Sequence, residues 1–253
     1  MKRRIAALLL CACLCLTGGC ARQTGAAVLC LQEGETAARA LCSQSSALSY
    51  ASASSDTAAL QQMESGQCDF ALVTEKAMRK AEADGFARVD SVLLGAFHIL
   101  TRTGAVSAWD KTTRVVIVGK KDGYADKLAQ QVLSCALYGT VRYQEEEDAL
   151  QAFRRKRADV VMGLFLPGDA AVAAALKKTK NASLTALPES LVSIRLPDES
   201  MGTYSLTIGQ ETVSTYALYG AVAAKTAKTG ETVRAAVDQA DLRVTIWPKF
   251  SFQ

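Results

Sequence analysis

The sequence predicts an α/β fold with two lobes, each a mixed, mostly parallel sheet flanked by helices. Apolar strand-like segments alternate with helix-like segments in two successive runs, over residues 26–100 and 114–195. The strand-like segments are continuously apolar, as expected for strands that a parallel sheet buries on both faces. A third segment, residues 203–225, follows the second run and is expected to return to the first lobe. The chain would then cross between the lobes twice.

The first run predicts three strands and two helices, followed by a long β-rich segment. The second helix has Ser55 or Asp56 at its start and Gly66 at its end, which are typical capping residues. The expected elements are strands at residues 26–32, 47–54 and 68–75, helices at residues 33–46 and 55–66, and the β-rich segment at residues 88–104.

The second run repeats this alternation. Its second helix begins with the acidic residues 145–148 and ends with the basic residues 154–157, which complements the helix dipole. We interpret these charges as a solvated helix surface rather than a binding patch. The expected elements are strands at residues 112–119, 140–144 and 159–165, helices at 122–137 and 145–158, short strands at 183–188 and 191–197, and a last helix at 229–241.

Residues 1–19 have the pattern of a secretory signal. Basic residues at positions 2–4 precede an apolar run, and small residues follow it. The apolar run, Ile5 to Leu16, is shorter than the roughly 20 residues that span a bilayer. We therefore exclude this segment from the fold and predict its removal on export.

Cys20 is the predicted lipid anchor. The small residues Thr17, Gly18 and Gly19 before it resemble the lipobox of bacterial lipoproteins, in which the cysteine thiol is acylated and becomes the new N-terminus. An ordinary cleaved signal is the alternative. With an acylated Cys20, residues 20–25 form a tether, and the protein is extracytoplasmic and attached to the cell membrane.

Removing the signal leaves a nearly neutral protein. The chain has 29 basic and 25 acidic residues, and three of the basic residues belong to the signal. Nucleic-acid-binding domains carry a basic stripe, so we expect no nucleic-acid partner. The cysteines at positions 30, 42, 68 and 135 lack the spacing of a metal site, and the sequence assigns no disulfide among them.

Four segments resemble the TAXI-type extracytoplasmic solute-binding proteins that serve TRAP transporters. The first, residues 56–78, has a helix, a Gly-x-x-Asp turn at Gly66 and Asp69, and an apolar strand. The other three, residues 108–133, 146–176 and 196–226, resemble later strands and helices of the family in the same order. The resemblance implies a type II periplasmic-binding-protein fold.

The resemblance also implies domain boundaries and partners. Lobe I would contain residues 26–103 and 213–253, and lobe II residues 104–212. A monomeric receptor of this kind would bind a small-molecule solute of the amino-acid or dicarboxylate class and deliver it to membrane permease subunits, of either a TRAP or an ABC transporter. Two loops, residues 32–36 and 119–123, depart from the glycine-rich loops of the family.

The candidate ligand-binding residues follow the carboxyl ends of the predicted strands. In open α/β sheets, ligands bind at this edge, where N–H groups of helix N-termini favour carboxylates or phosphates. Glu35 and Glu75 would suit an amino group, which fits a carboxylate-bearing amino acid. Helix capping is the alternative role for the Ser, Thr and Asp residues, and core packing for Tyr204 and Tyr216. The candidates are Gly34, Glu35, Thr36, Ser54, Ser55, Asp56, Thr74, Glu75, Lys120, Lys121, Asp122, Gly123, Tyr124, Phe165, Pro167 and Tyr204.

No catalytic, cofactor or metal site is expected. The sole histidine, His98, lies in an alternating strand-like segment, where a packed or surface role is usual. The sequence contains no nucleophile elbow, zinc-protease motif or Walker loop. The competing hypothesis is a lipoprotein that uses the same scaffold, with a degenerate pocket, for protein interaction or signalling.

Overall fold

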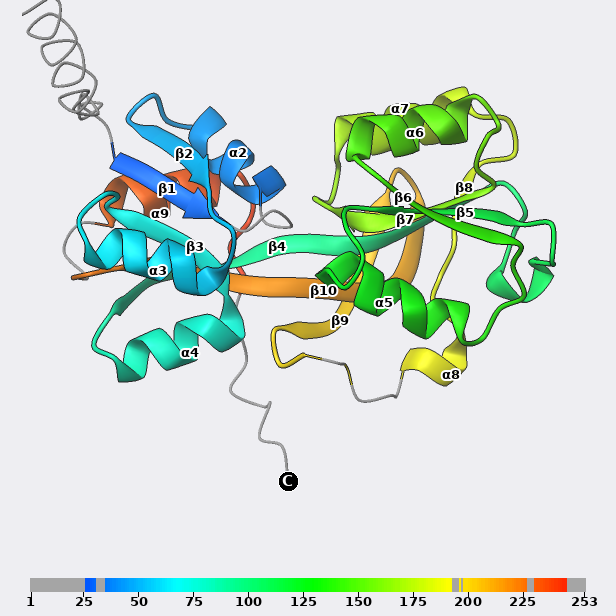
Figure 1. Cartoon of the computed structure of the whole chain (residues 1–253). Helices are drawn as coiled ribbons and strands as arrows, with labels where there is room; N and C mark the ends of the chain where they lie inside the picture. The colour runs from blue at the N-terminus through cyan, green and yellow to red at the C-terminus, as the bar shows by residue number, and fades with distance from the viewer. Residues whose placement is uncertain (1–25, 31–34, 193–195, 197, 227–229, 245–253) are drawn as a thin grey trace, which may run out of the picture.

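The computed structural model describes residues 26–30, 35–192, 196, 198–226 and 230–244, which form two lobes (Figure 1). Two long strands join the lobes, and in each lobe helices cover both faces of the sheet. The predicted two-lobed α/β fold is confirmed. The predicted signal, the lipid anchor Cys20, the tether and the candidate Gly34 lie outside the described residues.

The first lobe is built from parallel βαβ units. Its elements are β1 (Ala26–Cys30), α2 (Glu35–Ser43), β2 (Leu48–Ser52), α3 (Asp56–Glu64), β3 (Phe70–Thr74) and α4 (Glu75–Ala83). β1 pairs in parallel with β2 on one side and with β3 on the other. Helix α4 has no counterpart among the predicted elements, although its buried Met78 and Ala81 lie one helical turn apart.

Two long strands, β4 (Ala87–Thr101) and β10 (Glu211–Ala224), cross between the lobes. In the first lobe they pair antiparallel with each other, and β10 also pairs with β3. From Ala96 onward β4 pairs with β7 (Val160–Phe165) of the second lobe. The prediction gave each lobe its own sheet, but the two sheets form one hydrogen-bonded sheet because the crossings are strands. The predicted boundaries at residues 103 and 213 stay a prediction.

The crossing is irregular at its midpoint. Leu218 pairs with Gly95, and Tyr219 pairs with Leu93, so that Leu94 is an extra residue on β4. Such a bulge bends a strand and increases its twist. It lies two residues before Ala96, at which β4 begins to pair in the second lobe.

The second lobe repeats the parallel arrangement around β5. Its elements are the 3₁₀ turn η1 (Val106–Ala108), β5 (Arg114–Val118), α5 (Tyr124–Leu133), β6 (Thr140–Gln144), α6 (Glu146–Arg154), β7, α7 (Ala170–Lys178), β8 (Ser183–Leu184), α8 (Glu189–Val192) and β9 (Met201–Ile208). β5 pairs in parallel with β6 and β7, whereas β9 forms an antiparallel hairpin with β10. The last helix, α9 (Glu231–Gln239), returns to pack against β4 and α2 of the first lobe.

One predicted strand, at residues 191–197, is wrong where the structure describes it. Leu191 and Val192 end helix α8, and Leu196 lies in no strand. The amide of Leu191 donates to the carbonyl oxygen of Pro188, and the hydroxyl of Tyr216 donates to the carbonyl oxygen of Leu191. These bonds hold the backbone in a helical turn that buries Leu191.

Alternation along β4 divides the core of the second lobe between two faces of the sheet. Phe97 and Ile99 pack in the same cluster as Leu128 of α5. Leu100 points to the opposite face and packs in the cluster that contains Phe153 of α6. This period of two is the expected consequence of strand geometry. No helix in the described part of the chain is both long and apolar enough to cross a membrane.

Three cysteines of the described residues, Cys42, Cys68 and Cys135, carry free thiols. Burial raises the pKa of Cys68 to about 11. Cys68 is therefore a protonated, packed side chain. Within the described ranges, no group of three or more His, Cys, Asp or Glu side chains is arranged to hold a metal ion.

His98 is a fully buried core residue of β4. Its Nδ1 lies 2.8 Å from the carbonyl oxygen of Ala96, and its ring meets Phe165 edge-on, with centroids 5.3 Å apart. Its Nε2 has no hydrogen-bond partner among the described residues. Burial lowers the pKa of His98 to about 4. The neutral form is therefore the one that the fold accommodates.

Acidification should destabilise the protein through His98. Because the pKa is about 6.5 in the unfolded chain and about 4 in the fold, the unfolded state binds the proton first as the pH falls. The free energy of unfolding then falls through this window, by about 2 kcal/mol from His98. Urea denaturation at about pH 7 and about pH 4.5 should show a smaller loss for His98→Leu. The same loss of unfolding free energy in both proteins would contradict the conclusion that the fold holds His98 in its neutral form.

Candidate ligand-binding cleft

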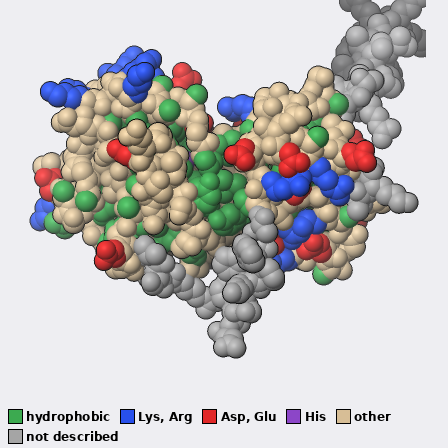
Figure 2. Space-filling view, turned by 180° about the vertical axis from the view of Figure 1, so that it is seen from behind, with side chains coloured by type: hydrophobic (Ala, Val, Ile, Leu, Met, Phe, Trp, Pro, Cys, Tyr) green, Lys and Arg blue, Asp and Glu red, His purple; other side chains and the backbone are tan. Residues whose placement is uncertain are grey.

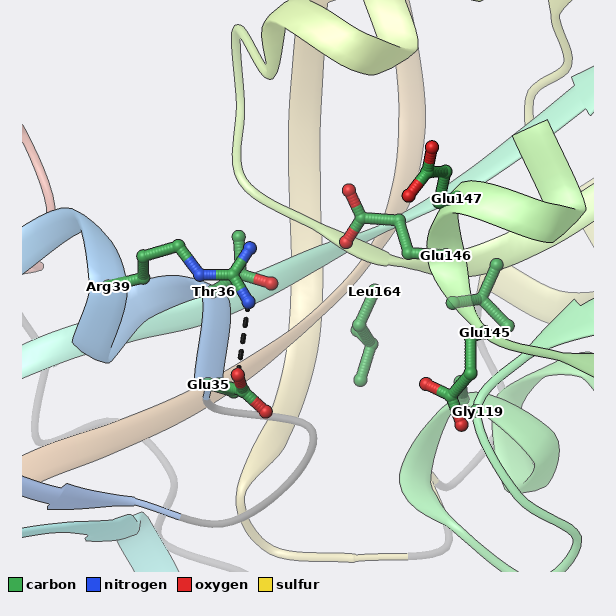
Figure 3. A pocket seen from close by; sticks show the side chains of 10 residues that line it. Glu35, Thr36, Arg39, Gly119, Glu145, Glu146, Glu147 and Leu164 are labelled. Atoms are coloured by element: carbon green, nitrogen blue, oxygen red, sulfur yellow. Dashed lines mark hydrogen bonds and ion pairs between the residues drawn. The ribbon is translucent and has the colours of Figure 1, made fainter. Parts of the chain in front are cut away.

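A cleft of about 310 Å³ lies between helix α2 of the first lobe and the carboxyl ends of β5, β6 and β7 in the second (Figure 3). Hydrophobic side chains gather in the hollow between the lobes in the opposite view (Figure 2). The lining residues are Glu35, Thr36 and Arg39 of α2, and Val118, Gly119, Ala125, Glu145, Glu146, Glu147 and Leu164 of the second lobe. Both lobes therefore contribute to one cavity at the edge of the sheet where ligands bind in α/β folds.

The wall from the first lobe carries a small hydrogen-bonded cluster. Nη2 of Arg39 lies 3.0 Å from Oε1 of Glu35, one helical turn earlier. The hydroxyl of Tyr50 donates to the same carboxylate oxygen at 3.3 Å and accepts from Nε of Arg39 at 3.4 Å. The bonds to Tyr50 and Glu35 raise the pKa of Arg39. Arg39 therefore lines the cleft with its guanidinium group already bonded to Glu35 and Tyr50.

The wall from the second lobe is the acidic start of α6. The strand β6 ends at Gln144, and Glu145, Glu146 and Glu147 follow it directly. Glu145 and Glu147 are exposed, whereas Glu146 is half-buried. Burial raises the pKa of Glu146, and so does the nearby carboxylate of Asp169. Arg39 and Glu35 of the opposite wall also act on Glu146, with opposing signs.

The floor of the cleft is apolar and depends on a glycine. Val118, Ala125 and Leu164 provide its apolar side chains. Gly119 has a φ of 99°, in the left-handed region that other residues avoid. Its amide donates to the carbonyl oxygen of Gln144 at 2.9 Å. This bond fixes the end of β5 beside the residue that precedes the acidic wall.

Among the predicted ligand-binding residues that the structure describes, Glu35 and Thr36 line the cleft. Ser54 is exposed, and Ser55 caps α3 by accepting from the amide of Ala58 at 3.1 Å. Asp56 accepts hydrogen bonds from the amide and the hydroxyl of Thr74. Ser55 therefore has the helix-capping role that the sequence left open, whereas Asp56 bonds to Thr74 within the first lobe.

The predicted residues of the second lobe lie beside the cleft rather than in its lining. The loop between β5 and α5 contains Lys120, Lys121, Asp122 and Gly123, and Tyr124 is the first residue of α5. Both lysines are exposed. The buried carboxylate of Asp126 accepts from the amide of Asp122 at 2.8 Å and from the side chain of Gln130 at 2.9 Å. The loop is thus held from within α5.

The predicted aromatic residues pack largely in the core. Phe165 is fully buried, and Pro167 is partly buried in the loop after β7. Tyr204 is half-buried on β9, and burial raises its pKa. Tyr216 is fully buried, with its hydroxyl bonded to the backbone of α8. Core packing, the alternative given for Tyr204 and Tyr216, holds for Tyr216.

Glu75 is buried at the start of α4, in an ion-pair network outside the cleft lining. Its carboxylate lies 2.6 Å from Nη1 of Arg88 and 3.2 Å from Nε of Arg79. Arg88 also pairs with Glu82 at 2.9 Å. The side chain of Glu75 is 6% exposed, so this charge depends on its partners.

Sequence reasoning missed Arg39 and did not include the start of α6 in the candidate site. The acidic residues there were interpreted as solvated surface, yet Glu145, Glu146 and Glu147 line the cleft. They directly follow the carboxyl end of a strand, which is the same signal that selected Glu35 and Thr36. Their acidic charge is also what the dipole of α6 favours at its N-terminus, so the charge alone did not indicate a place on the cleft.

Comparisons with known proteins find similar structures but no sequence relative. No family model and no curated protein matches the chain. The chain is similar to an ABC transporter protein from Parabacteroides distasonis, with 13% identity and a TM-score of 0.49 over 86% of this chain and 74% of that one. It is also similar to the GluR0 ligand-binding core in complex with L-glutamate, with 15% identity and a TM-score of 0.43 over 87% of this chain and 94% of that one. A third similar structure is the periplasmic aliphatic sulphonate binding protein of Escherichia coli, with 16% identity and a TM-score of 0.41 over 87% of this chain and 73% of that one.

Removing Arg88 should destabilise the fold far more than removing Arg39. Arg88→Met leaves the buried Glu75 with the more exposed Arg79 alone, at a cost of about 3 kcal/mol. Arg39→Met breaks an exposed i,i+4 pair, at a cost of about 0.5 kcal/mol. Urea denaturation near neutral pH measures both. Equal costs would contradict a structural role for the Glu75 network.

Proposed function

We propose that this chain is a lipid-anchored solute-binding protein of a membrane transporter, which binds a small molecule between its lobes. The observation that supports this function is the cleft whose walls come from α2 and from the strand ends of the second lobe. A molecule bound there contacts both lobes at once, so binding favours a closed arrangement that permease subunits can recognise. The resemblance to TAXI-type proteins supports a TRAP transporter as the partner.

The two crossing strands supply the hinge in this proposal. The bulge at Leu94 lies two residues before Ala96, which pairs with Ala217 of β10 on one side and with Phe165 of β7 on the other. A bulge interrupts the regular ladder and permits bending at that point. The part of β4 before the bulge would move with the first lobe, and the part from Ala96 onward, which pairs with β7, would move with the second lobe.

The charge of the cleft favours the amino-acid class over the dicarboxylate class. Four glutamates and one arginine line it, a net charge of −3 among the described lining residues. A dicarboxylate would add two negative charges to that excess, whereas an amino acid offers an ammonium group to the glutamates. Its carboxylate would face Arg39, the cation of the lining.

A solute that binds in the cleft should stabilise the protein, and filling the cleft should prevent this. At 100 times its dissociation constant, such a solute stabilises by roughly 2.7 kcal/mol. A thermal-shift screen of amino acids and dicarboxylates, on protein purified from cells that express the full chain, measures the effect.

Thr36→Trp, on the cleft wall, should abolish the shift. Thr57→Trp is the matched control, because Thr57 is the exposed second residue of α3 as Thr36 is the second residue of α2. If no solute shifts the melting temperature of the unmodified protein or of either variant, the result would instead favour the non-transport lipoprotein.

The lipid anchor can be tested independently of the solute. Cys20→Ser should lose incorporation of a clickable palmitate analogue and move from the membrane fraction to the soluble fraction. Two acyl chains contribute on the order of 20 kcal/mol of attachment, so the redistribution should be nearly complete. Cys15→Ser, within the predicted signal, should keep both label and location. Loss of label in Cys15→Ser alone would place the anchor elsewhere.

A further inference from the structure

The second-lobe wall of the cleft presents uncompensated negative charge. Three residues that line the cavity, Glu145, Glu146 and Glu147, form what we call the acidic wall. Within the described residues, none of these three carboxylates forms an ion pair or a side-chain hydrogen bond. Glu146 extends from the start of α6 toward Arg39 on the opposite wall (Figure 3). The cavity therefore brings carboxylates of one lobe to face the other lobe across open space.

The cation of the opposite wall does not neutralise this charge. Arg39 is bonded to Glu35 at 3.0 Å and to Tyr50, so the wall formed by α2 is close to neutral by itself. Glu35 and the acidic wall are like charges on different lobes. Burial and Asp169 raise the pKa of Glu146, Arg39 lowers it, and Glu35 raises it. Closing the empty cleft would bring these carboxylates together without a counter-charge.

A positively charged solute would remove this conflict. Between the two charged walls lie Val118, Ala125 and Leu164, which offer an apolar surface to an aliphatic chain. An alkyl chain that ends in a cation is complementary to an apolar surface next to an acidic wall. The charged end would meet carboxylates, and the chain would cover Leu164.

We propose that the solute is a cation, with an ammonium or guanidinium group held by the acidic wall and an aliphatic chain over the apolar floor. This inference rests on the proposed function and specifies the chemical class of its ligand. The bound cation also supplies the counter-charge that lets Glu35 and Glu146 approach. Closure is then coupled to the charge of the solute.

Isothermal titration calorimetry on protein purified from cells that express the full chain tests the proposal with defined probes. L-lysine, L-arginine and putrescine are the cationic probes, L-glutamine the neutral probe, and L-glutamate the anionic probe. We expect binding of at least one cationic probe, with L-glutamate weaker by roughly tenfold to hundredfold. Affinity should also fall as salt is added, because the acidic wall is partly exposed.

Neutralising the wall gives the matched comparison. Glu146→Gln with Glu147→Gln should weaken the cationic probe by roughly tenfold to hundredfold. Asp148→Asn is the control, since Asp148 lies in the same first turn of α6 but does not line the cleft. Glu146→Lys should shift the preference toward the anionic probe. Circular dichroism verifies that each variant is folded.

The possible outcomes separate this inference from the proposed function. Preferential binding of L-glutamate, abolished by Thr36→Trp, would overturn the inference and leave a solute receptor. Cation binding that Glu146→Gln with Glu147→Gln does not weaken would also overturn it. Absence of binding by every probe and by a wider solute screen would overturn the proposed function. Cation binding lost in the double variant and kept in Asp148→Asn would support both.

Discussion

The antiparallel pairing of β4 with β10 is the constraint on which the architecture depends. Residues 87–96 of β4 pair with residues 217–224 of β10 in the first lobe, and the remainder of β4 pairs with β7 in the second. The pairing requires close contact, since a Cβ added to Gly220 of β10 would lie 2.6 Å from Cδ1 of Leu94 on β4. Two parallel βαβ layers are thereby joined side by side, with the starts of α2 and α6 on opposite sides of one cleft.

Local patterns in the sequence predicted most elements of this fold. Continuous apolar runs identified β1, β3, β5 and β7, and capping residues marked the start and end of α3, because these signals depend on neighbours along the chain. The joined sheet depends on pairing between β4 and residues more than a hundred positions later, which no local pattern contains. The described start of the segment predicted as a strand at residues 191–197 differs for the same reason, because the hydroxyl of Tyr216 on β10 bonds to the carbonyl oxygen of Leu191.

The candidate site was predicted in part for a related reason. Of the residues that the strand-end rule selected, Glu35 and Thr36 line the cleft, whereas others have side chains that the fold uses internally. Asp56 accepts a hydrogen bond from Thr74, and Glu75 forms an ion pair with Arg88. Whether a polar residue after a strand faces a ligand or another part of its own lobe depends on its tertiary neighbours. The start of α6 satisfied the rule too, but its charges had a sufficient local explanation in the helix dipole.

The acidic wall reverses the electrostatic character that the fold would otherwise give this position. A helix N-terminus carries the equivalent of about half a positive charge and favours anions. Glu145, Glu146 and Glu147 place up to three negative charges at that same end of α6, so the side chains outweigh the backbone there. Because α6 itself provides the anions that its N-terminus favours, an external anion gains little at this position, whereas a cation meets carboxylates. Backbone geometry thus locates the cleft, while three side chains determine the sign of the charge that it selects.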